Sequence, residues 1–137
     1  MRSKKVILDT NLWISFLISK RLDFIDELLF KGKIKLVFSK ELIEEFLSVA
    51  QRQKFAKYFS DNNISELLKL FDKYGKLINI STKVEICRDA KDNFLLNLAI
   101  DGKADYLITG DADLLAIIKI KKTKIITWSD FIIELKG

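Results

Sequence analysis

The sequence contains no histidine and a single cysteine among its 137 residues. Without histidine, the chain cannot build a Ser-His-Asp or Cys-His nucleophile, an imidazole acid-base pair or a histidine-ligated zinc site. One cysteine excludes disulfides and thiolate metal clusters within the chain, and we expect Cys87 to be a small buried residue. An enzyme of this composition must therefore work through carboxylates, lysines, hydroxyls or a hard metal ion.

Long apolar runs are also missing. None approaches the roughly 18 residues that a membrane span needs, so we do not expect a transmembrane protein. Basic residues precede an apolar run at the amino end, but Asp9 and Asn11 interrupt it and no small-residue cleavage site follows, which argues against a signal peptide. We therefore expect a cytoplasmic protein. A composition of 49% hydrophobic and 31% charged residues predicts one globular domain over residues 1–137.

Short apolar runs that suit buried strands alternate along the chain with segments of helical spacing. We expect five strands, at residues 4–8, 34–38, 77–80, 106–109 and 125–127. Strands that alternate with helices form right-handed βαβ units around a mostly parallel sheet. The sequence therefore predicts an α/β fold, in the form of a three-layer α/β/α sandwich.

Capping residues and glycines indicate where the helices between these strands begin and end. One helix is expected from Leu12, and a second over residues 23–31 with Gly32 as its stop. Ser39 is the expected cap of a third helix. The other expected helices are one capped by Asn63 that runs through Tyr74 and stops at Gly75, one over residues 92–100 closed by Gly102, and a last one capped by Ser129 or Asp130.

Acidic residues gather at the edge of the predicted sheet where α/β proteins bind their ligands. Asp9 directly follows the first strand, and Asp111 and Asp113 follow the fourth across a Thr-Gly turn. Glu45 and Asp92 come from helices at the same edge. Because like charges raise one another's pKa, such a cluster is stable mainly when a cation occupies it. Oxygen ligands select Mg²⁺ or Mn²⁺, which can activate water for attack on a phosphodiester.

Each aspartate also has an explanation that needs no ligand. Asp9 can be a turn or capping residue before the first helix, and Asp92 can complement the dipole of its helix. Asp111 suits a turn, and Asp113 can cap the turn that follows. It is the joint placement of these acids at one edge that favours a functional site.

Glu45 is not distinguished from its neighbour Glu44 by helical periodicity. The two residues lie on opposite flanks of the apolar stripe of their helix, equally far from its centre. A solvated helix face is the ordinary place for either side chain. The pattern of residues alone therefore leaves open which glutamate faces the site.

Four segments of the sequence resemble the four motifs of PIN-domain nucleases, and more narrowly those of the PIN-family toxins of bacterial and archaeal toxin-antitoxin pairs. They are I-L-D-T-N at 7–11, S-K-E-L-I-E-E-F at 39–46, R-D-A-K-D-N-F-L at 88–95 and Y-L-I-T-G-D-A-D-L-L at 106–115. The resemblance covers essentially the whole chain. It implies a central five-stranded sheet in the order 3-2-1-4-5, which places the first and fourth strands side by side where the strand order reverses.

The same resemblance implies which residues form the site, and it prefers Glu45 to Glu44. The implied catalytic and metal-binding acids are Asp9, Glu45, Asp92 and Asp111. Asp113 matches a further acid that supports the metal. Polar residues that match positions beside the acids are Thr10, Asn11 and Thr109. The implied cofactor is Mg²⁺ or Mn²⁺.

Positive charge is the other notable feature, with 24 Lys and Arg against 19 Asp and Glu and a formal net charge of +5. Two basic stretches could steer RNA toward the acidic residues, because phosphate neutralisation dominates nucleic-acid affinity. One contains Arg52, Lys54 and Lys57 with Phe55 and Tyr58, and the other contains Lys119, Lys121, Lys122 and Lys124. For each stretch alone, a solubilising face is the competing interpretation.

These observations together predict a metal-dependent endoribonuclease, the toxin of a toxin-antitoxin pair, with RNA as substrate and an antitoxin protein as partner. One alternative is a PIN-like module that binds RNA or a partner without cutting. Another is a Mg²⁺-dependent phosphatase, because D-T-N resembles the D-x-D-x-T start of haloacid-dehalogenase-like enzymes. In that comparison Asn11 stands where the second acid belongs.

The early helices carry more apolar residues than one side of two short helices usually buries. These residues are Trp13, Phe16, Leu17, Ile18, Phe24 and Ile25. We expect them to mediate association with a second copy of the chain, as a homodimer, or with the antitoxin. Packing into the core is the alternative, for Trp13 in particular.

Overall fold

The computed structural model describes residues 3–19, 27–52, 61–87 and 92–136, which form an α/β fold around one mostly parallel sheet. The six strands are β1 (Lys4–Leu8), β2 (Ile34–Phe38), β3 (Gly75–Leu77), β4 (Tyr106–Ile108), β5 (Lys119–Ile120) and β6 (Thr123–Ile126). Their order in the sheet is β3-β2-β1-β4-β6-β5. Only the two-residue strand β5 pairs antiparallel, with β6.

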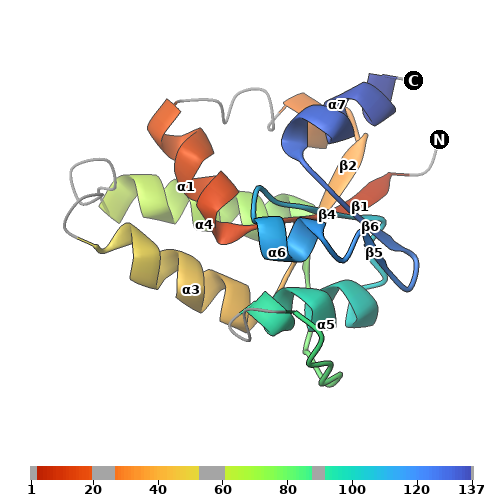
Figure 1. The fold of residues 1–137 in the computed structure, drawn as a ribbon. Helices are drawn as coiled ribbons and strands as arrows, with labels where there is room; N and C mark the ends of the chain where they lie inside the picture. Colours follow the sequence, from red (N-terminus) through yellow and green to blue (C-terminus); the bar gives the residue numbers. More distant parts are fainter. Residues whose placement is uncertain (1–2, 20–26, 53–60, 88–91, 137) are drawn as a thin grey trace.

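Helices cover both sides of this sheet, with α7 on one side and α5 on the other (Figure 1). The helices are α1 (Thr10–Ser19), α3 (Lys40–Ala50), α4 (Asp61–Tyr74), α5 (Asn93–Asp101), α6 (Ala112–Leu115) and α7 (Trp128–Lys136). Residues 27–30 are helical as well. The predicted three-layer α/β/α sandwich is therefore confirmed.

Strand β1 lies in the middle of the sheet, between β2 and β4. Its inner residues Val6, Ile7 and Leu8 are fully or almost fully buried, as a run of aliphatic residues with no alternation requires in a parallel sheet covered on both faces. The central position matters for the candidate site because Asp9 directly follows β1.

Aromatic side chains join the helices to the sheet and to one another. The ring of Phe71 in α4 packs against Trp13 of α1 and against Phe38 of β2, with ring centres 5.0 and 4.9 Å apart. Phe16 of α1 packs edge to face on Trp128 at the start of α7. Trp13 and Phe16 are 1% and 3% exposed, so both belong to the core and neither is available for an interface.

The remaining residues of that expected interface give little support to it. Ile18 is half-buried against the core. Phe24 and Ile25 lie outside the described residues, as does the side chain of Leu17. Cys87 is buried, as expected.

Local signals at several helix ends match the structure. The Ser39 hydroxyl accepts a hydrogen bond from the Leu42 N–H and caps α3, and Gly102 is the residue at which α5 ends. Gly32 adopts a left-handed φ of 71° after the helical turn at 27–30, which is the usual way for a glycine to end a helix. Residues 23–26 of that expected helix lie outside the described part of the chain.

Other boundaries differ from the sequence predictions. Helix α4 begins at Asp61, so Asn63 lies inside the helix and does not cap it. Helix α7 begins at Trp128, and the hydroxyl of Thr127 accepts the hydrogen bond of the Asp130 N–H, so Thr127 takes the capping role expected of Ser129 or Asp130.

The third strand was predicted at residues 77–80 and spans Gly75–Leu77, so it both begins and ends earlier, and Gly75 starts β3 as well as following the end of α4. A Cβ atom on Gly75 would lie 2.5 Å from the ring of Phe38, so only glycine allows this approach to β2. The five predicted strands lie in the order 3-2-1-4-5 with β6 as the fifth. Strand β5 adds a sixth that the sequence did not indicate, since two residues are too few for a strand pattern.

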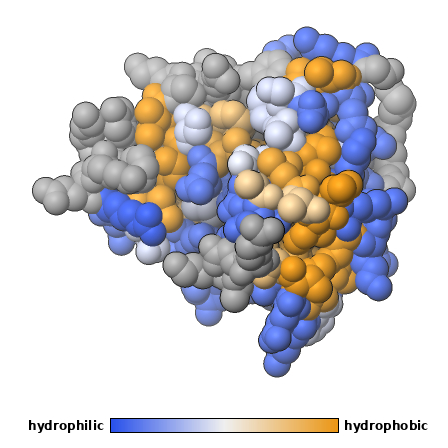
Figure 2. Space-filling view, in the orientation of Figure 1, coloured by the Kyte–Doolittle hydropathy of each residue, from blue (hydrophilic) through white to orange (hydrophobic). Residues whose placement is uncertain are grey.

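The surface seen in the orientation of Figure 1 differs in hydropathy from one region to another. Hydrophobic residues concentrate around α6 in the middle of this face, whereas the right-hand edge, where the β5–β6 hairpin lies, is hydrophilic (Figure 2). Among the described helices, none has the length and apolar character needed to cross a membrane.

Candidate active site

The carboxyl end of β1 places Asp9 in the centre of the molecule. The backbone N–H of Asp9 donates to the Ile108 carbonyl of β4, and its own carbonyl accepts from Leu12 and Trp13 in the first turn of α1. The sheet and the helix therefore hold this residue from both sides. Asp9 is only 7% exposed.

Burial raises the pKa of the Asp9 carboxyl, because a low-dielectric environment disfavours the charged form. The nearby charge of Asp111 raises it further. Hydrogen bonds from the Thr109 hydroxyl and from the backbone N–H groups of Asn11 and Thr10 act in the opposite direction and lower it. Asp9 therefore does contact the start of α1, as the capping interpretation requires, and it also lies beside a second acid.

Thr109 links the two acids that follow the central strands. Its buried hydroxyl donates to Asp9 Oδ2 at 2.7 Å and accepts from the Asp111 N–H at 3.0 Å. Asp111 in turn begins α6, and its Oδ1 accepts from the Asp113 N–H at 2.7 Å. One chain of hydrogen bonds thus runs from Asp9 to the first turn of α6. The capping residue of α6 is Asp111, whereas the sequence had suggested Asp113.

Glu45 approaches Asp9 from α3, which packs against α1. Burial raises the pKa of its carboxyl, and the charge of Asp9 raises it further. The Thr10 hydroxyl and the charge of Arg52 lower it. Within the described part of the chain, the buried atoms Glu45 Oε2 and Thr10 Oγ1 have no hydrogen-bond partner of ordinary geometry. Unsatisfied buried oxygens of this kind are uncommon and require an explanation.

Glu44, the neighbouring candidate, occupies the opposite environment. It is exposed and forms an ion pair with Lys40 one turn earlier, at 3.7 Å. The buried side of α3 is formed by Leu42, Phe46, Val49 and Ala50. This packing turns Glu45 toward Asp9 and Glu44 toward solvent, which helical spacing alone could not decide.

Asp92 stands at the N-terminus of α5, as predicted, and is half-buried. Among the described residues, its side chain makes no capping hydrogen bond to α5, and its place at the helix N-terminus is the one that the dipole explanation requires. Residues 88–91, which precede it, lie outside the described part of the chain. Asp113 is half-buried in the first turn of α6.

A pocket of about 280 Å³ opens beside Asp9 and Asp111. It is lined by Asp9, Asn11, Leu12, Gly110 and Asp111. Leu12 and Gly110 were not anticipated as site residues, and their only signal in the sequence is that each lies next to a predicted one. A Cβ atom on Gly110 would meet nothing within 4 Å, so this position stays open toward the pocket.

The donor atoms around this pocket suit a hard divalent cation. Asp9 and Asp111 offer carboxylate oxygens, and Glu45, with its unsatisfied Oε2 atom, lies close enough to Asp9 for their charges to interact. No three Asp, Glu or Cys side chains in the described ranges converge closely enough to hold a metal ion as they stand. Mg²⁺ commonly takes one or two carboxylates and completes its shell with water and substrate phosphate, so two direct ligands are compatible with these residues.

The basic residues lie in different places. Arg52 is exposed and close enough to Glu45 to lower its pKa. Lys54 and Lys57, with Phe55 and Tyr58, lie outside the described residues. The second group, Lys119, Lys121, Lys122 and Lys124, sits on the β5–β6 hairpin, at the end of the sheet opposite the acids. These lysines do not adjoin the acidic pocket.

Comparison with known proteins gives two matches. A family model described as a PIN domain matches residues 5–113, a range that contains all the predicted acids. An uncharacterized protein of Methanocaldococcus jannaschii, MJ1680, is 36% identical over 120 residues, which cover 82% of this chain and 74% of that protein. PIN domains are generally nucleases, and such nucleases generally use divalent metal ions. With its matched sequence and its β3-β2-β1-β4-β6-β5 sheet, the chain belongs to the PIN-domain family.

Proposed function

We propose that this protein is an endoribonuclease that hydrolyses RNA phosphodiester bonds with Mg²⁺ or Mn²⁺. The observation that carries the proposal is the pair of carboxyl groups of Asp9, which is buried, and Glu45, which is half-buried with a buried Oε2 atom; both have raised pKa values, in a chain of a nuclease family. Asp111 joins them through Thr109. Carboxylates are crowded in this way where they bind a cation or handle protons.

Each residue has a role in this proposal. Asp9 and Asp111 would hold the cation, with Glu45, Asp92 and Asp113 as further ligands or as water-mediated neighbours. When bound, the cation stabilises negative charge on the phosphate oxygens. Thr109 keeps the Asp9 carboxyl oriented through its 2.7 Å hydrogen bond. Thr10 and Asn11 supply a hydroxyl and an amide beside the acids.

Glu45 is suited to accept a proton from the attacking water. Its Oε2 atom is buried and has no partner among the described residues, and its raised pKa brings the carboxyl nearer to the range in which it can take up a proton. The chain has no histidine to do this work. A carboxyl group therefore has to fill the role that imidazole fills in many hydrolases.

The proposal is tested by incubating the protein with end-labelled single-stranded and hairpin RNA in Mg²⁺ or Mn²⁺. Cleavage should stop on addition of EDTA and should be lost in Asp9→Asn. Hydrolysis by water leaves a 5′-phosphate and a 3′-hydroxyl, whereas attack by the 2′-hydroxyl of RNA leaves a 2′,3′-cyclic phosphate, and end-group analysis separates the two.

Two outcomes would contradict the proposal. Cleavage that continues in EDTA and in Asp9→Asn would point to a contaminant or to another mechanism. Metal-loaded protein that binds RNA but cuts no member of a broad RNA pool would favour the non-catalytic binding module.

The proposal includes a biological role as the toxin of a toxin-antitoxin pair, with a cognate antitoxin and self-association as a homodimer. Resemblance to PIN-family toxins supports this role. The test is the neighbouring gene: a small upstream reading frame that encodes a DNA-binding protein is expected, and co-expression of that protein should suppress cleavage. Purified protein that stays strictly monomeric at high concentration in light scattering would remove the homodimer from the proposal.

A further inference from the structure

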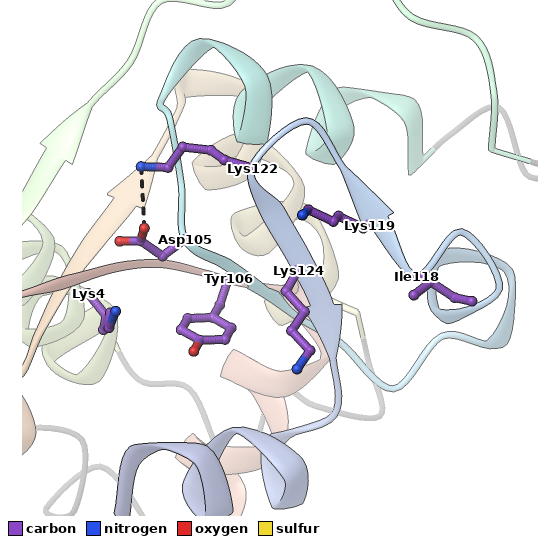
Figure 3. Close-up of a pocket in the computed structure, with 7 residues that line it drawn as sticks. All are labelled: Lys4, Asp105, Tyr106, Ile118, Lys119, Lys122 and Lys124. Carbon is purple, nitrogen blue, oxygen red and sulfur yellow. Dashed lines mark ion pairs between the residues drawn. The ribbon is translucent and has the colours of Figure 1, made fainter. Parts of the chain in front are cut away.

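A second, larger hollow lies at the end of the sheet opposite the acidic pocket. Its volume is about 450 Å³, and it is lined by Lys4, Asp105, Tyr106, Ile118, Lys119, Lys122 and Lys124 (Figure 3). Lys4 begins β1 and Tyr106 begins β4, so the hollow is at the amino ends of the parallel strands. The β5–β6 hairpin forms its other side (Figure 3).

Two of the four lysines in this hollow are already neutralised. Lys122 pairs with Asp105 at 3.3 Å, and Lys124 pairs with Glu134 of α7 at 3.0 Å. Asp105 is itself fixed, because its Oδ2 accepts from the backbone N–H of Lys5. These pairs hold the two lysines in place at the rim.

The other two lysines carry positive charge that the protein does not neutralise. Lys4 and Lys119 are exposed, and neither forms an ion pair with any residue that the structure describes. Burial, the charge of the Glu134 carboxylate and a hydrogen bond with it raise the pKa of the Tyr106 phenol, so this hydroxyl stays protonated and is directed at Glu134. The hollow thus offers two ammonium groups, those of Lys4 and Lys119, whose charge no described residue neutralises.

An unusual backbone conformation marks the rim of the same hollow. Ile118 has a φ of 70°, a region that β-branched residues rarely adopt, and its side chain is 67% exposed. Backbone hydrogen bonds on both sides hold it there: its N–H donates to the Leu115 carbonyl, and its carbonyl accepts from the Ile125 N–H. Strained residues of this kind are concentrated where proteins meet ligands.

We propose that this lysine-lined hollow binds the phosphate backbone of an RNA substrate at a distance from the cleavage site. The inference rests on the proposed ribonuclease function and extends it, by giving the enzyme a second contact with its substrate. Lysine ammonium groups are ordinary ligands of phosphate oxygens. Ile118 supplies an apolar contact for a ribose or a base beside them.

The lining of the hollow favours a nucleic acid over an acidic protein. One of its seven lining residues is aliphatic and one is aromatic, whereas protein partners are usually anchored by apolar side chains buried in pockets. Phosphate contacts need only charge and donors on an open surface.

The two sites are separated by the length of β1. Five residues at about 3.3 Å each place the hollow roughly 17 Å from the end of the strand at which Asp9 lies. A dinucleotide, with its single phosphodiester, can occupy only one of the two sites. A longer RNA can occupy both, so the hollow should improve the binding of long substrates and leave the cleavage of a dinucleotide unchanged.

The test uses the full chain with Lys4→Gln and Lys119→Gln combined, which we call the hollow variant. The matched control is Lys69→Gln with Lys83→Gln, which removes the same charge from two exposed lysines outside the hollow. Binding of a labelled 20-nucleotide RNA is measured by fluorescence anisotropy in EDTA over a series of salt concentrations. We expect the hollow variant to bind about tenfold more weakly at 50 mM salt, and the slope of log K against log salt to fall by about 0.7 for each lysine.

Cleavage supplies the second measurement. In the hollow variant, KM for the 20-nucleotide RNA should rise about tenfold while kcat stays unchanged, and kcat/KM for a dinucleotide should equal that of the wild type. Equal effects in the control variant, or an unchanged affinity and slope in the hollow variant, would overturn the inference. Polyglutamate that binds through Lys4 and Lys119 when RNA does not would overturn it as well, and would assign the hollow to an acidic protein.

Failure of this inference can be distinguished from failure of the proposed function. If Asp9→Asn abolishes cleavage while the hollow variant behaves as wild type, the result supports the ribonuclease function and contradicts RNA binding in the hollow. If the wild type cuts no RNA but binds it through Lys4 and Lys119, the hollow is an RNA site on a protein that is not a nuclease.

Discussion

Two carboxyl groups at the carboxyl edge of the sheet, those of Asp9 and Glu45, are removed from water wholly or in part in spite of their tendency to ionise. Burial raises the pKa values of both Asp9 and Glu45, and like charges raise them further: that of Asp111 acts on Asp9, and that of Asp9 acts on Glu45. Thr109 and Thr10 oppose this effect by offering hydroxyl groups. The site is thus built from residues that destabilise the fold when charged, as is common where proteins handle ions or protons.

The two adjacent glutamates of α3 should respond in opposite ways to the same substitution. Glu45→Gln removes the half-buried carboxyl beside Asp9 and should lower the RNA cleavage rate about 100-fold or more, the usual contribution of a group that transfers a proton. Glu44→Gln changes an exposed residue paired with Lys40 and should leave the rate within about twofold. Initial rates and circular dichroism of both variants check this. Loss of cleavage in Glu44→Gln alone would reverse the assignment.

Asp9→Asn should stabilise the fold at neutral pH when EDTA is present. A raised native pKa means that the folded protein binds the proton more tightly than the unfolded chain, so the free energy of unfolding falls as the pH rises through that native pKa. Asparagine avoids this loss and can still accept the Thr109 hydrogen bond. Urea unfolding at pH 7.5 should therefore show a higher midpoint for Asp9→Asn than for the wild type.

At acidic pH the advantage of Asp9→Asn should shrink, because Asp9 is then protonated in both the folded and the unfolded chain. Asp72→Asn, at an exposed position of α4, serves as the control and should show no such dependence on pH. A midpoint for Asp9→Asn that is lower than that of the wild type at pH 7.5 would show that burial of this carboxyl does not oppose folding.

At the scale of the element, α3 depends on its cap for the orientation of Glu45. Ser39 is fully buried, and its hydroxyl accepts the Leu42 N–H at 3.1 Å. Ser39→Ala should lower the free energy of unfolding by about 1 kcal/mol. The matched control is Ser48→Ala, at an exposed position later in the same helix, which should change stability by less than about 0.5 kcal/mol. Chemical denaturation measures both, and equal losses would argue against the cap.

Elements with a strong local pattern could be predicted from the sequence. The bounds of β1 and β2 match their apolar runs, and the caps at Ser39 and Gly102 follow from ordinary helix-end chemistry. Strands that form only because they pair with neighbouring strands could not be predicted as accurately from the sequence. Strand β3 is set by the approach of Gly75 to Phe38, and β5 by two hydrogen-bonded residues at the sheet edge.

In the candidate site, too, some features could be predicted from the local sequence and others depend on tertiary packing. The position of Asp9 and Asp111 after two buried runs was predictable, because parallel strands end at the same edge of a sheet. The choice between Glu44 and Glu45 depended on how α3 packs, which a residue pattern does not contain. The lysines of the β5–β6 hairpin were expected to guide RNA toward the acids, and they lie at the far end of the strands because the hairpin reverses there.

At the scale of the whole molecule, a bound cation should stabilise the fold by linking elements far apart in the chain. Mg²⁺ at ten times its dissociation constant should raise the free energy of unfolding by about 1.4 kcal/mol, which corresponds to a few degrees in Tm. Asp9→Asn combined with Asp111→Asn should abolish the shift. Differential scanning fluorimetry over a Mg²⁺ series checks this, and an equal shift in the double variant would place the ion elsewhere.

The bond between Thr109 and Asp9 joins residues that are 100 positions apart. On a ribosome that adds about 5–20 residues per second, Asp9 is made some 5–20 seconds before Thr109 and Asp111. During that interval β1 has no β4 beside it, so the hydrogen bond from the Asp9 N–H to the Ile108 carbonyl cannot form. A nascent chain that has not yet added β4 therefore cannot hold Asp9, Thr109 and Asp111 in the arrangement of the folded protein, and the candidate site forms only after translation has passed residue 111.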